Sequence, residues 1–282
     1  MKTVDQDQKV ARVCRRINCS RQNYYKACHK EEKATTDSKE LMELIQPIRA
    51  EMPRIGGKKL YFMIGDALEK KELKIGRDRF FKWLGQNDLL IRPKRMYVHT
   101  TNSHHRFWIH DNLTADIVLD RPNKLWVSDI TYIRTLQGNY YLALITDAYS
   151  RKIVGYDISD SLELEGCKRA LESALQTASD LSQLTHHSDR GIQYCSNQYT
   201  DKLKEMGIQI SMAAKGNCYE NALAERVNGI LKNEFNLDYT FKTKALAMKA
   251  VRQSIYIYNE RRPHWAINLQ TPPAKACCII NC

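Results

Sequence analysis

The 282-residue sequence predicts an α/β protein, in which a mixed sheet with helices on its faces follows an all-helical region. Residues 124–282 alternate β-rich and helical segments in the order βββαβαβαα, whereas residues 1–95 show only helix-period apolar spacing. The charge is divided in the same way: residues 1–110 hold 24 Lys and Arg against 13 Asp and Glu, and the remainder holds 20 against 19. We therefore expect a helical region at 1–95, a linker at 96–123 and a core at 124–282.

The first region is expected to consist of short helices: Ser20–Glu32, Ser38–Glu51, Lys58–Leu68 and Gly76–Leu84. Pro53 and the Gly56-Gly57 pair end the second of them. The last carries Arg77, Arg79 and Lys82. A helix, a glycine turn and a basic helix form the outline of a helix-turn-helix unit, which would bind nucleic acid. A small helical bundle with a solvated basic surface has the same outline.

The core is expected to begin with three strands joined by short turns, Leu125–Ile133, Asn139–Ala148 and Lys152–Ile158, which form an antiparallel meander. The remaining elements follow in this order: helix Leu162–Ala178, strand Leu184–Asp189, helix Asn197–Met206, strand Ile208–Met212, and helices Glu220–Phe235 and Lys242–Glu260.

Composition excludes several classes of protein. The apolar fraction of 43% is that of a globular chain, and no apolar run reaches the length of a membrane span. The first residues lack the apolar segment of a signal peptide, so we expect a cytoplasmic protein without a membrane partner. Cys28-His29 and His104-His105 occur without a C-x-x-C pair, so no zinc is expected. No P-loop sequence is found, so no nucleotide is expected.

Three carboxylates stand out by position and spacing. Asp129 lies inside an apolar strand, where an ionised carboxylate is costly unless it is paired or bound to a metal. Asp189 follows a short strand, and Glu225 lies in a predicted helix. There are 59 residues between Asp129 and Asp189, and 35 between Asp189 and Glu225. On a helix, four polar residues fall within an arc of about 60°: Asn221, Glu225, Asn228 and Lys232.

These residues belong to a larger set of motifs: W-x-x-D-x-T-Y at 126–132, D-x-x-S-R at 147–151, H-S-D-x-G-x-Q-Y at 187–194, N-A with E and K at 221–232, Y-N-x-x-R-P-H at 258–264, and T-P at 271–272. The set resembles the OrfB transposases of frameshifting bacterial insertion sequences, which are DDE enzymes with a retroviral-integrase-like core. Glu220 is a departure, because the family most often has Asp there.

The resemblance implies an RNase H-like core in which Asp129, Asp189 and Glu225 are catalytic and hold two magnesium or manganese ions. It implies cleavage of double-stranded DNA by water and joining by direct transesterification. It also implies an upstream OrfA product or fusion as a partner, and a homo-multimer on DNA. The residues expected to contact DNA are Lys232, Asn221, Arg77, Arg79, Lys82 and Arg262.

Some assignments stay open at this point. Asp147 is interpreted as a structural residue that caps the turn to Ser150. His187 is either a residue that supports the metal site or a packed strand residue, and Asn228 is a second candidate for support. Arg262 either binds phosphate or ends a helix. The rival functions are an RNase H-fold nuclease or resolvase that does not join strands, and a catalytically silent DNA-binding protein.

Overall fold

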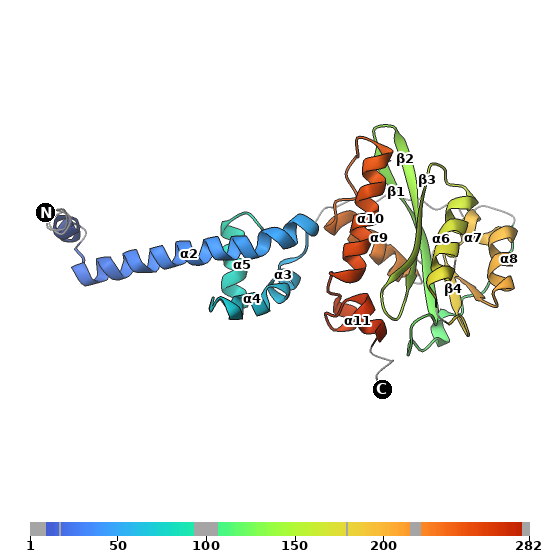
Figure 1. Cartoon of the computed structure of the whole chain (residues 1–282), viewed down its shortest axis with the longest axis horizontal. Helices are drawn as coiled ribbons and strands as arrows, with labels where there is room; N and C mark the ends of the chain where they lie inside the picture. Colours follow the sequence, from blue (N-terminus) through green and yellow to red (C-terminus); the bar gives the residue numbers. More distant parts are fainter. Residues whose placement is uncertain (1–9, 17, 93–106, 179, 215–220, 278–282) are drawn as a thin grey trace. The chain divides into compact units, whose positions relative to one another are not determined.

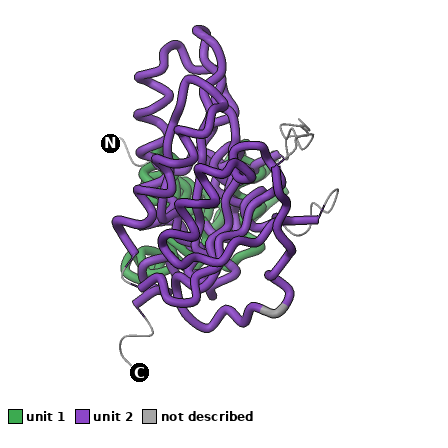
Figure 2. Tube along the Cα trace, turned by 90° about the vertical axis from the view of Figure 1, so that its right-hand side faces the viewer, with its two compact units in different colours: residues 1–50, 60–89 green, residues 51–59, 90–282 purple. Residues whose placement is uncertain are grey.

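The computed structural model describes residues 10–16, 18–92, 107–178, 180–214 and 221–277. The chain divides into two compact units, shown in Figure 2. Unit 1 comprises residues 1–50 and 60–89, and unit 2 comprises residues 51–59 and 90–282. The segment 51–59 therefore belongs to the same unit as the core, whereas the expected division assigned all of residues 1–95 to the helical region.

Unit 1 is helical, as expected, and its elements are α2 (Arg21–Glu51), most of α3 (Gly57–Met63), α4 (Gly65–Lys70) and α5 (Arg77–Gln86) (Figure 1). Asn23 N donates to Ser20 Oγ at 3.2 Å, which confirms Ser20 as a helix cap. Trp83 Nε1 donates to Ser38 Oγ at 2.8 Å and joins α5 to α2. In the described part of the chain, no helix is long and apolar enough to cross a membrane.

The expected helix boundaries in unit 1 are partly wrong. Ser20–Glu32 and Ser38–Glu51 form one continuous helix, because residues 33–37 contain neither Gly nor Pro to interrupt it. The hydroxyls of Thr35 and Thr36 bond back to carbonyls one turn earlier, so these polar side chains are accommodated within the helix. Lys58–Leu68 is instead divided between α3 and α4.

Unit 2 contains a five-stranded mixed sheet, as predicted: β1 (Leu125–Thr135), β2 (Gly138–Asp147), β3 (Ile153–Ser159), β4 (Thr185–Ser188) and β5 (Gln209–Met212). The strand order is β3-β2-β1-β4-β5. The first three strands are antiparallel, whereas β4 runs parallel to β1 and β5 parallel to β4. This pairing places the expected meander on one side of β1 and the two later strands on the other.

Among the described residues, four helices pack on the sheet, namely α6 (Leu164–Thr177), α8 (Asn197–Glu205), α9 (Ala222–Glu234) and α10 (Lys244–Glu260), whereas α7 (Ile192–Cys195) contacts α6 and α8, and α11 (Pro272–Cys277) contacts α10 (Figure 1). Of these, α7 and α11 were not expected. Trp126 belongs to an apolar cluster with residues of α6 and α8, and Val127 belongs to a second cluster with Ala224 of α9. Since side chains alternate along a strand, β1 presents Ser128 and Asp129 to opposite faces.

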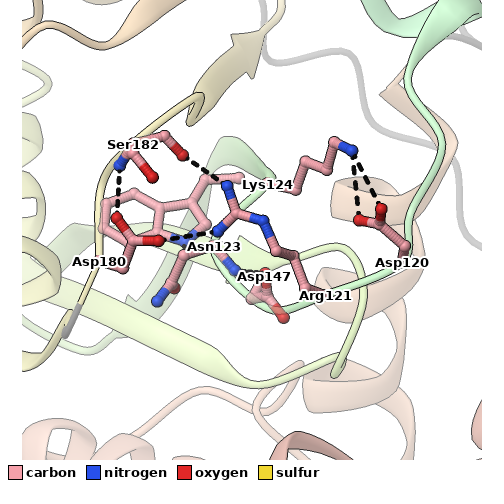
Figure 3. A network of polar contacts seen from close by, with 8 residues as sticks. Asp120, Arg121, Asn123, Lys124, Asp147, Asp180 and Ser182 are labelled. Atoms are coloured by element: carbon pink, nitrogen blue, oxygen red, sulfur yellow. Dashed lines mark hydrogen bonds and ion pairs between the residues drawn. The ribbon is translucent and has the colours of Figure 1, made fainter. Parts of the chain in front are cut away.

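The start of β1 is anchored by the polar network in Figure 3. Arg121 bonds Asp180 at 3.0 Å and the Ser182 carbonyl at 2.7 Å, which ties the approach to β1 to the loop before β4. Asp147 accepts from Asn123 N at 2.9 Å and from Ser150 N at 2.7 Å. Asp147 is buried, and these bonds confirm its interpretation as a turn-capping residue.

We expect Asp147→Asn to lower the free energy of unfolding by about 2 kcal/mol, because an amide nitrogen cannot accept from the buried Ser150 or Asn123 N–H groups. Asp120→Asn is the control, since its pair with Lys124 at 3.2 Å is exposed and its loss should leave stability nearly unchanged. Urea denaturation of both variants checks this. Equal losses in the two variants would contradict a structural role specific to Asp147.

Candidate active site

Asp129 lies on β1 and faces α9. Its Oδ2 accepts from Asn228 Nδ2 at 2.7 Å, and its Oδ1 accepts from the Ile130 backbone N–H at 2.9 Å. Burial raises the pKa of Asp129 to about 7, and the negative charges of Asp189 and, more weakly, Glu225 add to that shift while the hydrogen bonds oppose it. The three predicted carboxylates therefore interact electrostatically.

The position of Asp189 follows from the parallel pairing of β1 and β4. Ser128 is the last residue of β1 paired with β4, and its partner is Ser188. Asp129 and Asp189 come directly after this pair, so they lie next to each other where the β1–β4 ladder ends. Asp189 Oδ1 accepts from the Gly191 N–H at 2.9 Å. A Cβ on Gly191 would lie 2.9 Å from that same oxygen, so glycine leaves room for the carboxylate.

Glu225 lies in the first turn of α9 and is exposed. The polar stripe predicted on this helix does not simply face solvent: Asn221 and Asn228 are only 5% and 7% exposed. Asn221 Nδ2 donates to the Ser128 carbonyl at 3.4 Å, and Asn228 bonds Asp129. The two asparagines of the stripe are buried because β1 supplies polar partners for them, and Asn228 contacts the Asp129 carboxylate directly.

The oxygen atoms around Asp129 are suited to a hard divalent cation. The amide oxygens of Asn221 and Asn228 are buried without a hydrogen-bond partner, beside a carboxylate whose charge is poorly solvated. Hard oxygen ligands of this kind fit magnesium or its bound water. Within the described ranges, however, no three His, Cys, Asp or Glu side chains are gathered closely enough to hold an ion.

Two further candidates have structural partners. Lys232 Nζ lies 4.1 Å from the centre of the Tyr132 ring, and burial lowers the pKa of this lysine, as does the nearby Arg134. His187 is buried, and its Nδ1 lies 2.8 Å from Ser211 Oγ on β5. This contact favours the interpretation of His187 as a packed strand residue.

Arg262, which was expected either to bind phosphate or to end a helix, has a side chain that is only 2% exposed. Its Nε and Nη2 donate to the two carboxylate oxygens of Glu234, both at 2.8 Å. Lys59 of the segment 51–59 bonds the same carboxylate at 3.2 Å. Arginine in this bidentate geometry joins α9 to the chain that follows α10. Glu234 is accordingly a structural carboxylate.

The predicted DNA contacts in unit 1 are Arg77, Arg79 and Lys82, which are all exposed on α5. Arg77 pairs with the adjacent Asp78 at 2.9 Å, and the pair is solvent-exposed. Their role stays a prediction. Sequence reasoning missed Ser128, whose carbonyl receives Asn221 and whose hydroxyl bonds His186. Its only sequence signal is its place next to Asp129.

The sheet order, with Asp129 within β1 and Asp189 directly after the adjacent parallel strand β4, defines an RNase H-like core of the integrase type. Residues 120–218 and 206–272 match two models of the integrase core domain. The chain is 33% identical over 266 residues to an insertion element IS600 uncharacterized 31 kDa protein of Shigella sonnei, covering 93% of this chain and 96% of that one. It therefore belongs to the insertion-sequence transposases with an integrase core, and it is a DNA transposase.

Other relatives cover less of the chain. The transposase for insertion sequence element IS629 of Shigella sonnei is 38% identical over 187 residues, which cover 66% of this chain and 62% of that protein. A putative transposase for IS986/IS6110 of Mycobacterium tuberculosis is 42% identical over 130 residues, covering 43% and 47%. The family predicted from the motifs is thus confirmed.

Solved structures with a similar fold include retroviral integrases. The HTLV-2 integrase catalytic core domain in complex with magnesium is 19% identical, has a TM-score of 0.45, and covers 56% of this chain and 98% of that one. The simian T-cell lymphotropic virus intasome in complex with PP2A regulatory subunit B56 gamma is 17% identical, with a TM-score of 0.48 and coverage of 78% and 74%. These likenesses concern the fold.

We expect Asp129→Asn to stabilise the metal-free protein at pH 8. The pKa of Asp129 is about 7 in the folded chain against an ordinary value of 3.8, so its contribution to stability is lost as the pH rises between these values. The advantage of the variant over wild type should grow across that interval and reach at least about 1 kcal/mol. Urea denaturation in EDTA at pH 4, 6 and 8 measures it, with the exposed Asp201→Asn as control. An advantage independent of pH would contradict the shifted pKa.

Proposed function

We propose that this transposase cleaves and joins DNA strands with Asp129, Asp189 and Glu225 as its catalytic carboxylates. The observation that carries the proposal is the place of Asp129 and Asp189 directly after the last residue pair of β1 and β4. Glu225 approaches from α9 and adds to the electrostatic shift of Asp129. These carboxylates would hold two divalent cations, magnesium or manganese, which would activate the attacking oxygen and stabilise the leaving one.

The protein's own groups prepare this chemistry. Asn228 and the Ile130 backbone N–H each bond one oxygen of Asp129, at 2.7 and 2.9 Å, and so fix the orientation of this carboxylate. The unpartnered amide oxygen of Asn221 is placed to bind a metal-bound water or a DNA group. The electrostatic repulsion among the carboxylates favours cation binding, since a cation removes the cost of their charges.

The reaction would occur in two steps on double-stranded DNA. Water attacks a phosphodiester at the end of the element and frees a 3′-hydroxyl. That hydroxyl then attacks a second phosphodiester, so the new bond forms as the old one breaks and no nucleotide is consumed. Lys232 on α9 is half-buried, and its ammonium group lies over the Tyr132 ring. From there this group would contact a DNA phosphate.

Recognition of the element ends is assigned to unit 1. The exposed Arg77, Arg79 and Lys82 on α5 present a basic helix to the DNA backbone. Two partners are part of this proposal: a second copy of the chain on paired DNA ends, and an OrfA product or fusion upstream. We place this activity in the cytoplasm, on the nucleoid.

We expect Asp129→Asn, Asp189→Asn and Glu225→Gln each to reduce cleavage and strand transfer below about one-hundredth of the wild-type rate, because each removes an oxygen ligand of the reacting centre. DNA affinity should change little. The assay uses labelled element ends with magnesium, with and without the OrfA product, and gel shifts measure binding. Glu172→Gln on α6 is the control. Wild-type joining by any of the three variants would exclude that residue from the triad.

We expect Lys232→Ala to weaken DNA binding and to lower the slope of log affinity against log salt by about one, because one phosphate contact is lost. Lys249→Ala removes an exposed lysine of α10 and serves as the matched control. Fluorescence anisotropy between low and moderate salt measures both slopes. If the two variants share the wild-type slope, Lys232 does not bind a phosphate.

A further inference from the structure

Three buried polar side chains meet on the face of the sheet that is opposite to the carboxylates. Ser128 Oγ lies 2.7 Å from His186 Nε2, and the Tyr199 hydroxyl lies 3.0 Å from the same nitrogen. Both hydroxyls are therefore within hydrogen-bond distance of the same ring nitrogen. We name these residues of β1, β4 and α8 the Ser–His–Tyr triangle. The reaction described above does not use them.

The surroundings of the triangle are apolar. Trp126, Ile145 and Leu203 are fully buried members of the same cluster, and the Tyr199 ring packs edge-on against His186 with ring centres 5.4 Å apart. Burial lowers the pKa of His186 to about 3, so the imidazole is neutral. Apolar side chains of similar volume usually stabilise a core at least as well as a buried polar group does. A satisfied polar network instead specifies one arrangement of the elements that it joins.

The arrangement in question is the register of β1 against β4. Four residue pairs form this parallel ladder, from Leu125 with Thr185 to Ser128 with Ser188. A slip of one residue would turn the apolar side chains to the wrong face, so burial alone excludes it. A slip of two residues would keep every side chain on its face. It would also move Asp129 by about 7 Å relative to Asp189, beyond the separation of about 4 Å typical of paired metal ions.

We propose that the Ser–His–Tyr triangle locks the register of β1 and β4 and so sets the spacing of Asp129 and Asp189. His186 lies two residues before Ser188, the strand partner of Ser128, so the bond between Ser128 and His186 is diagonal. A slip of two residues in either direction changes the separation of these two side chains. Tyr199 holds the imidazole from α8, outside the ladder. The three are positioning residues, and the inference rests on the proposed function.

The test measures metal binding by the full chain without DNA. Mn²⁺ is titrated calorimetrically into wild type, Ser128→Ala and Tyr199→Phe. We expect Kd for Mn²⁺ to rise by roughly tenfold in both variants, the size of effect seen when groups that orient metal ligands are removed. The magnesium concentration that half-saturates DNA cleavage should rise in parallel, and cleavage at saturating magnesium should largely recover.

Thr200→Val is the matched control. It removes one buried hydroxyl from the same helix, bonded to the Ser196 and Asn197 carbonyls, and leaves the triangle intact. Its Kd for Mn²⁺ should stay within about twofold of wild type, although its melting temperature falls. Should Ser128→Ala fail to fold, Tyr199→Phe decides, since it keeps the ring and removes only the hydroxyl.

The outcomes separate the two hypotheses. The register lock is overturned if folded Tyr199→Phe binds Mn²⁺ with wild-type affinity, or if Thr200→Val loses as much affinity as Tyr199→Phe does. Neither result contradicts the proposed carboxylate site. If wild type binds Mn²⁺ no better than Asp129→Asn and does not cleave DNA, the proposed function fails and the register lock fails with it.

Discussion

The parallel pairing of β1 with β4 is the contact on which the site depends. Asp129 and Asp189 are separated by 59 residues in the chain, and this ladder brings them next to each other at its end. Every larger feature of unit 2 supports it: β2 and β3 extend β1 on one side, β5 extends β4 on the other, and helices cover the clusters around Trp126 and Val127. A short ladder carries a site of this kind because packing on both faces fixes it.

The cost of this arrangement is electrostatic. Burial and neighbouring carboxylates raise the pKa of Asp129 to about 7, so the ionised form is disfavoured in the folded protein. The polar atoms of Asn221 and Asn228 add to the cost, since their amide oxygens are buried without partners. Both features are unfavourable for stability alone. A bound divalent cation would neutralise the carboxylate charge and accept the unpartnered oxygens as ligands, so that both features would favour cation binding. The same residues therefore carry the proposed function.

Local sequence signals were sufficient for most of the fold. The strands of the meander, α6, α8 and α10 follow from apolar periodicity, and Asp147 was identified as structural because its turn context is local. Predictions failed where distant residues decide the outcome. Nothing within the Arg262 segment indicates that Glu234 lies against it, and nothing in α9 alone shows that Asn221 and Asn228 meet polar groups of β1. In α2, by contrast, the polar residues 33–37 were expected to separate two helices, but the structure has one continuous helix there.

The segment 51–59 changes how the core should be delimited. Arg54 N donates to the Glu234 carbonyl at 3.0 Å, and Lys59 bonds the Glu234 carboxylate, so this segment completes the last turn of α9. Glu234 also receives Arg262, and removing any one of these partners would leave buried charge uncompensated. Since α9 carries Glu225 and Asn228, the helix of the candidate site depends on residues that precede the basic linker in sequence. A fragment beginning after that linker would retain all three carboxylates and still lack part of the structure that holds them.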